Sequence, residues 1–159
     1  MALVALGLGS NLGNRLLNLK NAVRSMERSG LRVMRASDVF ETAPWGITDQ
    51  PCFLNACALL ECALSPRELL ESLKDIEARL GRTMTRRWGE RLIDLDILLI
   101  DSLIHREADL CVPHPEMHRR GFVLVPLARI IPDRVHPLTG RTIASMASDF
   151  PEELRICSL

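Results

Sequence analysis

The chain has 159 residues, of which 47% are hydrophobic and 25% are charged, and its 20 basic residues balance its 20 acidic residues. This composition is typical of a single globular domain, which we expect to span residues 1–159, and it argues against a disordered chain. A formal net charge of zero argues against a protein that coats nucleic acid or an anionic membrane.

The first part of the chain predicts a strand, a helix and two further strands. An apolar run at 3–9 ends in glycine, and residues 14–29 place apolar side chains at helical spacing. Residues 31–40 alternate loosely and predict a strand, whereas the prolines and the glycine of 42–51 predict a loop. Residues 53–63 form a second long apolar run and predict a buried strand.

The second part begins with a helix start signal. Ser65 is suited to cap the helix, Pro66 to occupy its first position, and Glu68 to complete a capping box. After this helix, residues 82–91 lack an apolar period and predict a loop, and residues 92–100 predict a strand. The rest of the chain contains six prolines and predicts turns, one-turn helices and an edge hairpin.

This order of elements defines the predicted fold class. It is α+β, a ferredoxin-like β-α-β-β-α-β antiparallel sheet with the helices on one face and an irregular C-terminal extension. Many unrelated proteins share this arrangement, so the function has to be argued from particular residues.

Neither the cysteines nor the hydropathy pattern indicates secretion or a membrane. The five cysteines are an odd number without a C-x-x-C pair, which argues against a disulfide framework and a thiolate zinc site. The N-terminus lacks the basic segment of a signal peptide, and no apolar stretch reaches the roughly 18 residues of a membrane span. We therefore expect a cytoplasmic protein that contacts no membrane.

Two aspartates are the sharpest chemical feature. On a strand, Asp94 and Asp96 point to the same face while the apolar residues between and beside them face the core. Paired carboxylates suit two Mg²⁺ ions in phosphoryl transfer, although an isolated D-x-D is more often the solvated face of an amphipathic strand. Residues 79–91 favour the metal site because they contain five arginines and one acid, a charge pattern that suits a bound triphosphate.

The segment 112–120 adds further phosphate donors, namely His114 and Arg120. His114 and His118 are four residues apart, but prolines flank His114 and no third ligand lies nearby, which disfavours a zinc site. The N-terminal GLGSNLGN has its third glycine displaced by one place from a dinucleotide loop, so we interpret Gly7 and Gly9 as part of a tight turn. The chain contains no P-loop motif and no G-x-S-x-G.

Two phenylalanines lie beside polar residues that suit a flat heterocycle. Phe53 is close in sequence to Asn55, and Phe122 is close to Arg120. Two aromatic rings can sandwich a heterocycle while an amide both donates to its edge and accepts from it. Ordinary core packing is the alternative for either phenylalanine alone.

Taken together, six stretches carry a resemblance to one family, the 6-hydroxymethyl-7,8-dihydropterin pyrophosphokinases of folate biosynthesis. They are GLGSNLGN, FETAPWG, QPCFLNA, EARLGR, RWGERLIDLDILL and VPHPEMHRRGFVLVPL, in that order. The resemblance implies a ferredoxin-like monomer that binds two Mg²⁺ ions and transfers diphosphate from ATP to the hydroxymethyl group of the pterin, with release of AMP.

The resemblance also implies roles for single residues. Asp94 and Asp96 would hold the Mg²⁺ ions and form the catalytic set with Arg82 and Arg91. ATP would be bound by Glu77, Arg82, Arg87, Trp88, Arg91, Ile97, His114 and Arg120. The pterin would be bound by Thr42, Pro44, Trp45, Phe53, Asn55, Asp94 and Phe122. Residues 82–91 correspond to the mobile lid of the family.

The chain departs from the family pattern at Met84, where a second arginine is usual, at Glu90 instead of proline, and at Phe40 instead of tyrosine. Two other kinds of function stay open from the sequence. One is an RNA-binding module of the same fold, against which the paired acids and the scarcity of aromatic residues argue. The other is a catalytically weakened, pterin-binding regulator.

Overall fold

A computed structural model of the chain describes residues 1–43, 49–81 and 91–150, together with the backbone of 155–156. Its main sheet is antiparallel, with the strand order β5-β1-β4-β3-β8, and β2 also pairs with β4. The strands are β1 (Ala2–Ser10), β2 (Arg32–Ala36), β3 (Phe40–Thr42), β4 (Phe53–Cys62), β5 (Asp94–Ile100) and β8 (Arg155–Ile156). A separate hairpin is formed by β6 (His105–Arg106) and β7 (Cys111–Val112).

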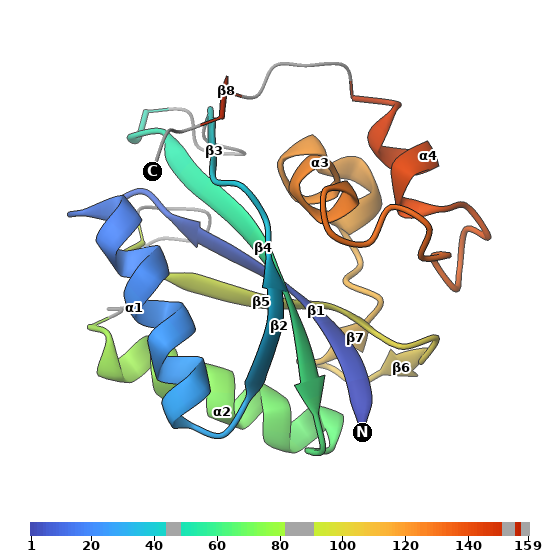
Figure 1. Cartoon of the computed structure of the whole chain (residues 1–159), viewed down its shortest axis with the longest axis horizontal. Helices are drawn as coiled ribbons and strands as arrows, with labels where there is room; N and C mark the ends of the chain where they lie inside the picture. The colour runs from blue at the N-terminus through green and yellow to red at the C-terminus, as the bar shows by residue number, and fades with distance from the viewer. Residues whose placement is uncertain (44–48, 82–90, 151–154, 157–159) are drawn as a thin grey trace.

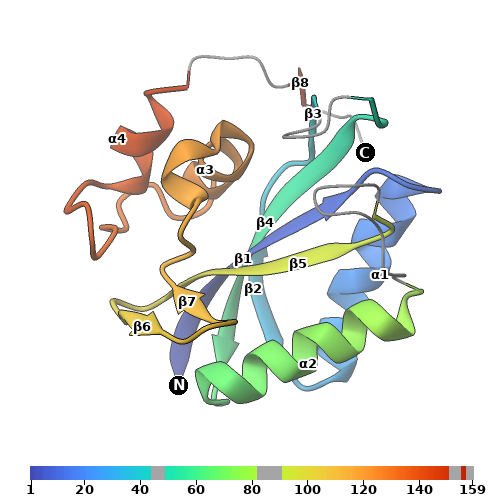
Figure 2. The ribbon, with the colours of Figure 1, turned by 180° about the vertical axis from the view of Figure 1, so that it is seen from behind.

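Helices cover both faces of the sheet. One face carries α1 (Arg15–Arg28) and α2 (Pro66–Arg79), and the other carries α3 (Gly121–Ala128) and α4 (Ile143–Ala147) (Figures 1 and 2). A short 3-10 helix, η1 (Met117–Arg119), precedes α3. None of the described helices is long and apolar enough to span a membrane.

The element order confirms the predicted ferredoxin-like class. Both long helices lie where they were predicted. Ser65 forms the predicted capping box with Glu68, and the structure adds a cap on α1, where the Asn14 side chain accepts a hydrogen bond from the Leu17 N–H. A hairpin does form in the C-terminal third, but it is a separate two-stranded sheet and not an edge of the main sheet, as had been expected. This third is more regular than expected, because α3 and α4 build a second helical layer.

The prediction of one strand over 31–40 is wrong, because the structure divides it into β2 and β3. Ala36 pairs with Ala58, and Phe40 pairs with Asn55. The chain therefore advances four residues from β2 to β3 while it advances only three along β4. Between them, the Cys57 N–H donates to Ser37 Oγ at 2.8 Å, and a side chain thus replaces a backbone carbonyl. The strand predicted at 92–100 begins two residues later, at Asp94.

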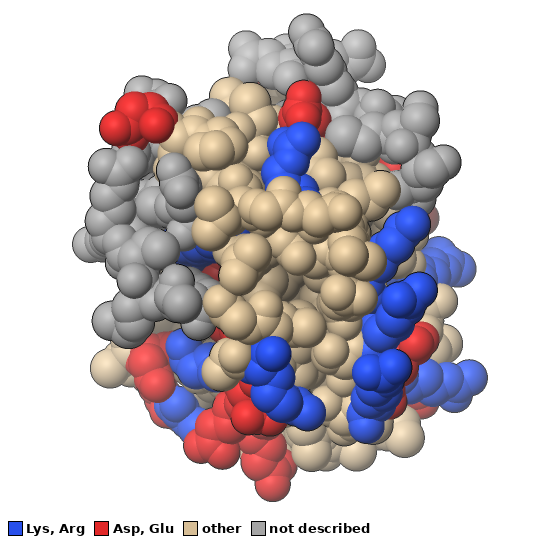
Figure 3. Space-filling model, turned by 90° about the vertical axis from the view of Figure 1, so that its left-hand side faces the viewer, with Lys and Arg blue, Asp and Glu red and all other residues tan. Residues whose placement is uncertain are grey.

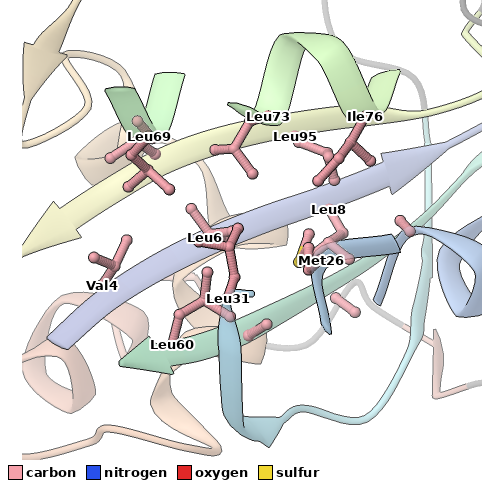
Figure 4. Close-up of a cluster of buried hydrophobic side chains, with 14 of the residues drawn as sticks. Val4, Leu6, Leu8, Met26, Leu31, Leu60, Leu69, Leu73, Ile76 and Leu95 are labelled. Atoms are coloured by element: carbon pink, nitrogen blue, oxygen red, sulfur yellow. The ribbon is translucent and has the colours of Figure 1, made fainter. Parts of the chain in front are cut away.

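The first hydrophobic cluster fills the space between the sheet and the helices α1 and α2 (Figure 4). Its central side chains have no solvent exposure: Leu6, Met26, Leu60, Leu73 and Ile76. Burial of each such side chain contributes about 1.5–3 kcal/mol to the free energy of unfolding. This cluster also contains Ile93, Leu95 and Ile97, as the alternation in the sequence predicts.

A second hydrophobic cluster lies on the opposite face, under α3 and α4. A β-bulge in β5 helps to build it. Ala5 pairs with Leu99 and Leu6 pairs with Ile97, which leaves Leu98 as the extra residue, and both Leu98 and Leu99 join this second cluster. On this face of the sheet, β5 therefore presents Asp94 and Asp96 at its beginning and the buried Leu98 and Leu99 near its end.

Candidate active site

A pocket of about 140 Å³ opens on the face of the sheet that carries α3 and α4, at the end where β5 begins. It lies among β1, β4, β5 and the segment that leads into α3. The residues that the sequence analysis proposed and that line this pocket are Thr42, Phe53, Asn55, Arg91, Asp94, Asp96, His114, Arg120 and Phe122. Residues separated by about eighty positions in the sequence thus share one cavity.

Two glycines of β1 form the floor of the pocket. Gly7 pairs with Asp96 and Gly9 pairs with Asp94, so both glycines lie within the strand, and the tight turn expected here is wrong. A β-carbon on Gly9 would come within 3.1 Å of Asn55 Oδ1. The missing side chains therefore leave the space above the sheet in which the pocket forms.

The acidic end of the pocket consists of Asp94 and Asp96. Arg91 Nη1 donates a hydrogen bond to Asp94 Oδ2 at 2.8 Å, and both side chains are about one-fifth exposed. The pKa of Asp96 is raised to about 7. Burial is the larger cause, and the neighbouring Asp94 carboxylate is the second. The neighbouring carboxylates of Asp94 and Asp96 repel each other, and a bound cation would relieve this repulsion.

The donor set suits Mg²⁺ better than zinc. Carboxylate oxygens are the ligands that this hard cation prefers. Within the described ranges, no group of three or more His, Cys, Asp or Glu side chains gathers to hold a metal. The protein would thus supply two carboxylates and leave the remaining coordination positions to phosphate oxygens and water.

Glu77 and Ile97 lie outside the pocket lining. Glu77 is a buried residue of α2, and its Oε2 accepts a hydrogen bond at 3.0 Å from the N–H of Leu95, the residue between the two aspartates. The Ile97 side chain is buried in the first hydrophobic cluster. These positions fit a structural support for β5 rather than side-chain contact with a ligand in the pocket.

His114 and Arg120 bring hydrogen-bond donors to the same pocket. The His114 N–H donates to Leu98 O at 2.9 Å, so the bulge of β5 fixes the position of this histidine. His114 Nδ1 accepts from the Glu116 N–H at 3.1 Å, and burial together with Arg120 lowers the pKa of His114 to about 4. The imidazole is therefore neutral near pH 7 and carries its proton on Nε2.

The aromatic part of the pocket contains Phe53 and Phe122. Asn55 Nδ2 donates a hydrogen bond to Thr42 Oγ1 at 2.6 Å, and both residues are buried. This bond fixes the orientation of the amide. The Arg120 guanidinium lies 5.6 Å from the centroid of the Phe122 ring. The aromatic part of the pocket therefore adjoins the donors His114 and Arg120.

Sequence reasoning missed Asn11, whose side chain is 1% exposed. Its N–H donates to Arg91 O at 3.1 Å, and its Oδ1 accepts from the Arg91 N–H at 2.8 Å. Its Nδ2 donates to Gln50 Oε1 at 2.8 Å and to Pro51 O at 3.0 Å. Asn11 therefore ties the end of β1 to two segments that border the pocket. Its place in GLGSNLGN, one of the stretches that carry the resemblance, was the signal for it in the sequence.

Several proposed site residues lie outside the described part of the chain. They are Pro44 and Trp45 of the pterin set, and Arg82, Arg87 and Trp88 of the nucleotide set. The departures Met84 and Glu90 also fall there, whereas Phe40 is a buried residue of β3.

Comparison with known proteins identifies the family. A sequence model described as 7,8-dihydro-6-hydroxymethylpterin-pyrophosphokinase matches residues 5–132. The 2-amino-4-hydroxy-6-hydroxymethyldihydropteridine pyrophosphokinase of Methylorubrum extorquens is 45% identical over 139 residues, which cover 87% of each chain. The protein of the same name from Haemophilus influenzae is 39% identical over 152 residues, or 95% of this chain and 94% of that one.

Solved structures share the fold. The crystal structure of Plasmodium falciparum HPPK-DHPS matches with a TM-score of 0.72 at 17% identity, over 94% of this chain and 44% of that chain. The sequence matches place the chain among the pyrophosphokinases of folate biosynthesis, a class of transferases, and they do not favour an RNA-binding module. The chain belongs to the 7,8-dihydro-6-hydroxymethylpterin-pyrophosphokinase family.

Proposed function

We propose that this chain transfers the β,γ-diphosphoryl group of ATP to the hydroxymethyl oxygen of 6-hydroxymethyl-7,8-dihydropterin. The hydroxymethyl oxygen bonds to the β-phosphorus, the bond from the β-phosphorus to the oxygen bridging to the α-phosphate breaks, AMP leaves, and the hydroxyl proton passes to water. Family membership supports this reaction. The observation that carries it is one pocket lined both by aromatic rings with an amide and by paired carboxylates.

The aromatic part of the pocket binds the pterin in this proposal. Phe53 and Phe122 would contact the faces of the ring, as aromatic side chains contact flat heterocycles. Asn55 would bond to polar atoms at the ring edge with Oδ1 and with the amide hydrogen that Thr42 leaves available. Thr42 is thus a positioning residue. Pro44 and Trp45 would complete this part of the site.

The acidic and basic part binds the triphosphate. Asp94 and Asp96 would hold two Mg²⁺ ions, which supply charge neutralisation and polarise the phosphoryl group when they are bound. His114 would donate from Nε2, and the Arg120 guanidinium would bind phosphate oxygens as a charged donor. Arg82, Arg87 and Trp88 would add contacts from the segment 82–91.

Arg91 has a double role in this proposal. Its guanidinium orients the Asp94 carboxylate in the absence of substrate and would stabilise charge on the transferring diphosphate. Its backbone is held on both sides by Asn11, so Arg91 enters the reaction with little freedom to move. Glu77 and Ile97 would act on the nucleotide side through the backbone of β5 rather than by side-chain contact.

We further propose that the enzyme acts as a monomer in the cytoplasm, on these two substrates and without nucleic acid or membrane partners. The described cysteines Cys52, Cys57, Cys62 and Cys111 are free thiols, which suits a reducing compartment. The balanced net charge is consistent with a protein that does not coat polyanions.

A steady-state assay tests the proposed reaction. AMP should appear only when ATP, Mg²⁺ and the reduced pterin are all present. Asp96→Asn should slow its release by about a hundredfold or more while thermal melting shows an intact fold. Binding of both substrates without AMP would support the weakened regulator instead. A shift of single-stranded RNA at moderate salt, without AMP release, would contradict the enzyme and support the RNA-binding module.

A further inference from the structure

A second cavity lies on the other face of the sheet, between α1 and the strands. Its volume is about 290 Å³, near the lower end of the range for small-molecule sites. Apolar side chains of α1, β1 and β4 line most of it, among them Leu16, Leu19 and Val23 of the helix. It is therefore separated by the sheet from the pocket that binds the substrates.

Local sequence and the strand break together create this cavity. Ala36 of β2 pairs with Ala58 of β4, and these two small residues, with Ala56, face the cavity. The bulky Leu54 and Leu60 stand on either side of them along β4 and pack into the core. Ser37, which follows Ala36 where β2 ends, also lines the cavity and stays bonded to Cys57 of β4 by two hydrogen bonds of 2.8 Å.

Two cations flank the cavity. Lys20 and Arg24 are one helical turn apart on α1, line the cavity and are exposed. Neither makes an ion pair with a described residue, whereas Arg15 pairs with Glu41 and Arg32 pairs with Glu61. Figure 3 views the side of the molecule on which α1 lies, and basic side chains form a column along the right-hand edge of a largely uncharged surface.

We propose that this cavity binds a small amphipathic monocarboxylate, with its apolar body under α1 and its carboxylate between Lys20 and Arg24. Burial of the apolar body supplies the hydrophobic contribution, and the two cations supply charge-assisted contacts that a neutral molecule would not make. Inorganic phosphate lacks the apolar body and would leave the cavity unfilled. The site is additional to the pyrophosphokinase reaction.

The two sites touch the same strands from opposite sides. Leu8 of β1 and Ala56 and Cys57 of β4 border both cavities, whereas Gly9 and Asn55 line only the substrate pocket. The ligand occupies the far face of these strands, so it should not compete with ATP or the pterin. Its binding should be detectable with the substrate pocket full.

Octanoate and 3-phenylpropanoate are suitable probes, because they compare an aliphatic with an aromatic body on the same carboxylate. Each is titrated into the protein saturated with pterin, and backbone amide resonances of Ala36 and Ala58 are followed by NMR. At least one carboxylate should produce saturable shifts there, and octan-1-ol should bind at least about tenfold more weakly, a ratio equal to 1.4 kcal/mol.

Variants of the cavity complete the test. The double substitution Lys20→Gln, Arg24→Gln should weaken carboxylate binding at least about tenfold, and Ala36→Leu should weaken it by filling the mouth. Arg28→Gln, which removes one positive charge from the same helix outside the cavity, should leave the affinity unchanged. Equal affinity of octan-1-ol, equal affinity of the double variant, or shifts confined to Gly9 and Asn55 would overturn the proposal. AMP release is measured separately, so failure here leaves the assigned reaction intact.

Discussion

Two aspartates on one face of a strand concentrate the negative charge of the pocket, and their positions make a direct prediction. Asp94→Asn and Asp96→Asn should each reduce turnover by about a hundredfold or more at saturating Mg²⁺, because each amide is a poor ligand for a hard cation. Thermal melting should show a stable fold, since the substitutions remove like-charge repulsion. Near-normal turnover in either variant would contradict the two-metal assignment.

The Thr42–Asn55 hydrogen bond predicts a selective effect on the pterin. Thr42→Val removes the acceptor and releases the amide, so pterin affinity should fall by about 1–3 kcal/mol while ATP affinity stays the same. Thr42→Ser retains the hydroxyl and should restore pterin binding. Isothermal titration with each ligand checks the prediction, and a parallel loss of both affinities would show that the bond only supports the fold.

His114 links stability to pH. Its pKa of about 4 in the folded protein lies below the ordinary value of 6.5, so the unfolded chain binds more protons between these values. Stability should therefore fall as the pH drops from about 6.5 to about 4, by up to roughly 3 kcal/mol from this group. His114→Gln should make the pH dependence shallower across that window in urea denaturation. Identical slopes in the two proteins would refute the burial argument.

At the scale of elements, the end of β1 connects the segments that border the pocket. Asn11→Ala should lower the free energy of unfolding by about 1–3 kcal/mol, because the Arg91 N–H loses its buried acceptor. The same variant should reduce turnover more than ATP affinity, since Arg91 would lose its fixed position.

A second variant separates the two sides of Asn11. Asn11→Asp retains an acceptor for the Arg91 N–H but loses the donors to Gln50 and Pro51. If Arg91 is the important partner, Asn11→Asp should recover turnover relative to Asn11→Ala. Wild-type kinetics and stability in both variants would show that this network does not position the site.

Local signals predicted whole elements well. The capping box at Ser65 and the periodicity of 14–29 depend on neighbours in the sequence, so both helices appear where they were expected. The break at Ser37 and the bulge at Leu98 depend on partners from β4 and from the segment after β7. No local pattern could reveal them, yet the bulge fixes His114.

At the scale of the whole molecule, the sheet divides two environments. One face packs against α1 and α2, and the other holds both the second hydrophobic cluster and the pocket. The sequence motifs predicted most of the pocket lining, because the resemblance fixes residue roles directly. Composition and periodicity alone would have found the paired acids and a strand through Gly7 and Gly9, but not Asn11 or the place of these glycines under the pocket.

In the proposed reaction this pocket moves a diphosphoryl group as one unit. The most direct measurement supplies ATP labelled at the γ-phosphorus, with Mg²⁺ and the reduced pterin, and follows both products. We expect one AMP for each pterin diphosphate, with the label in that pterin product. Formation of ADP with a pterin monophosphate, or release of the label as inorganic phosphate without pterin modification, would contradict it.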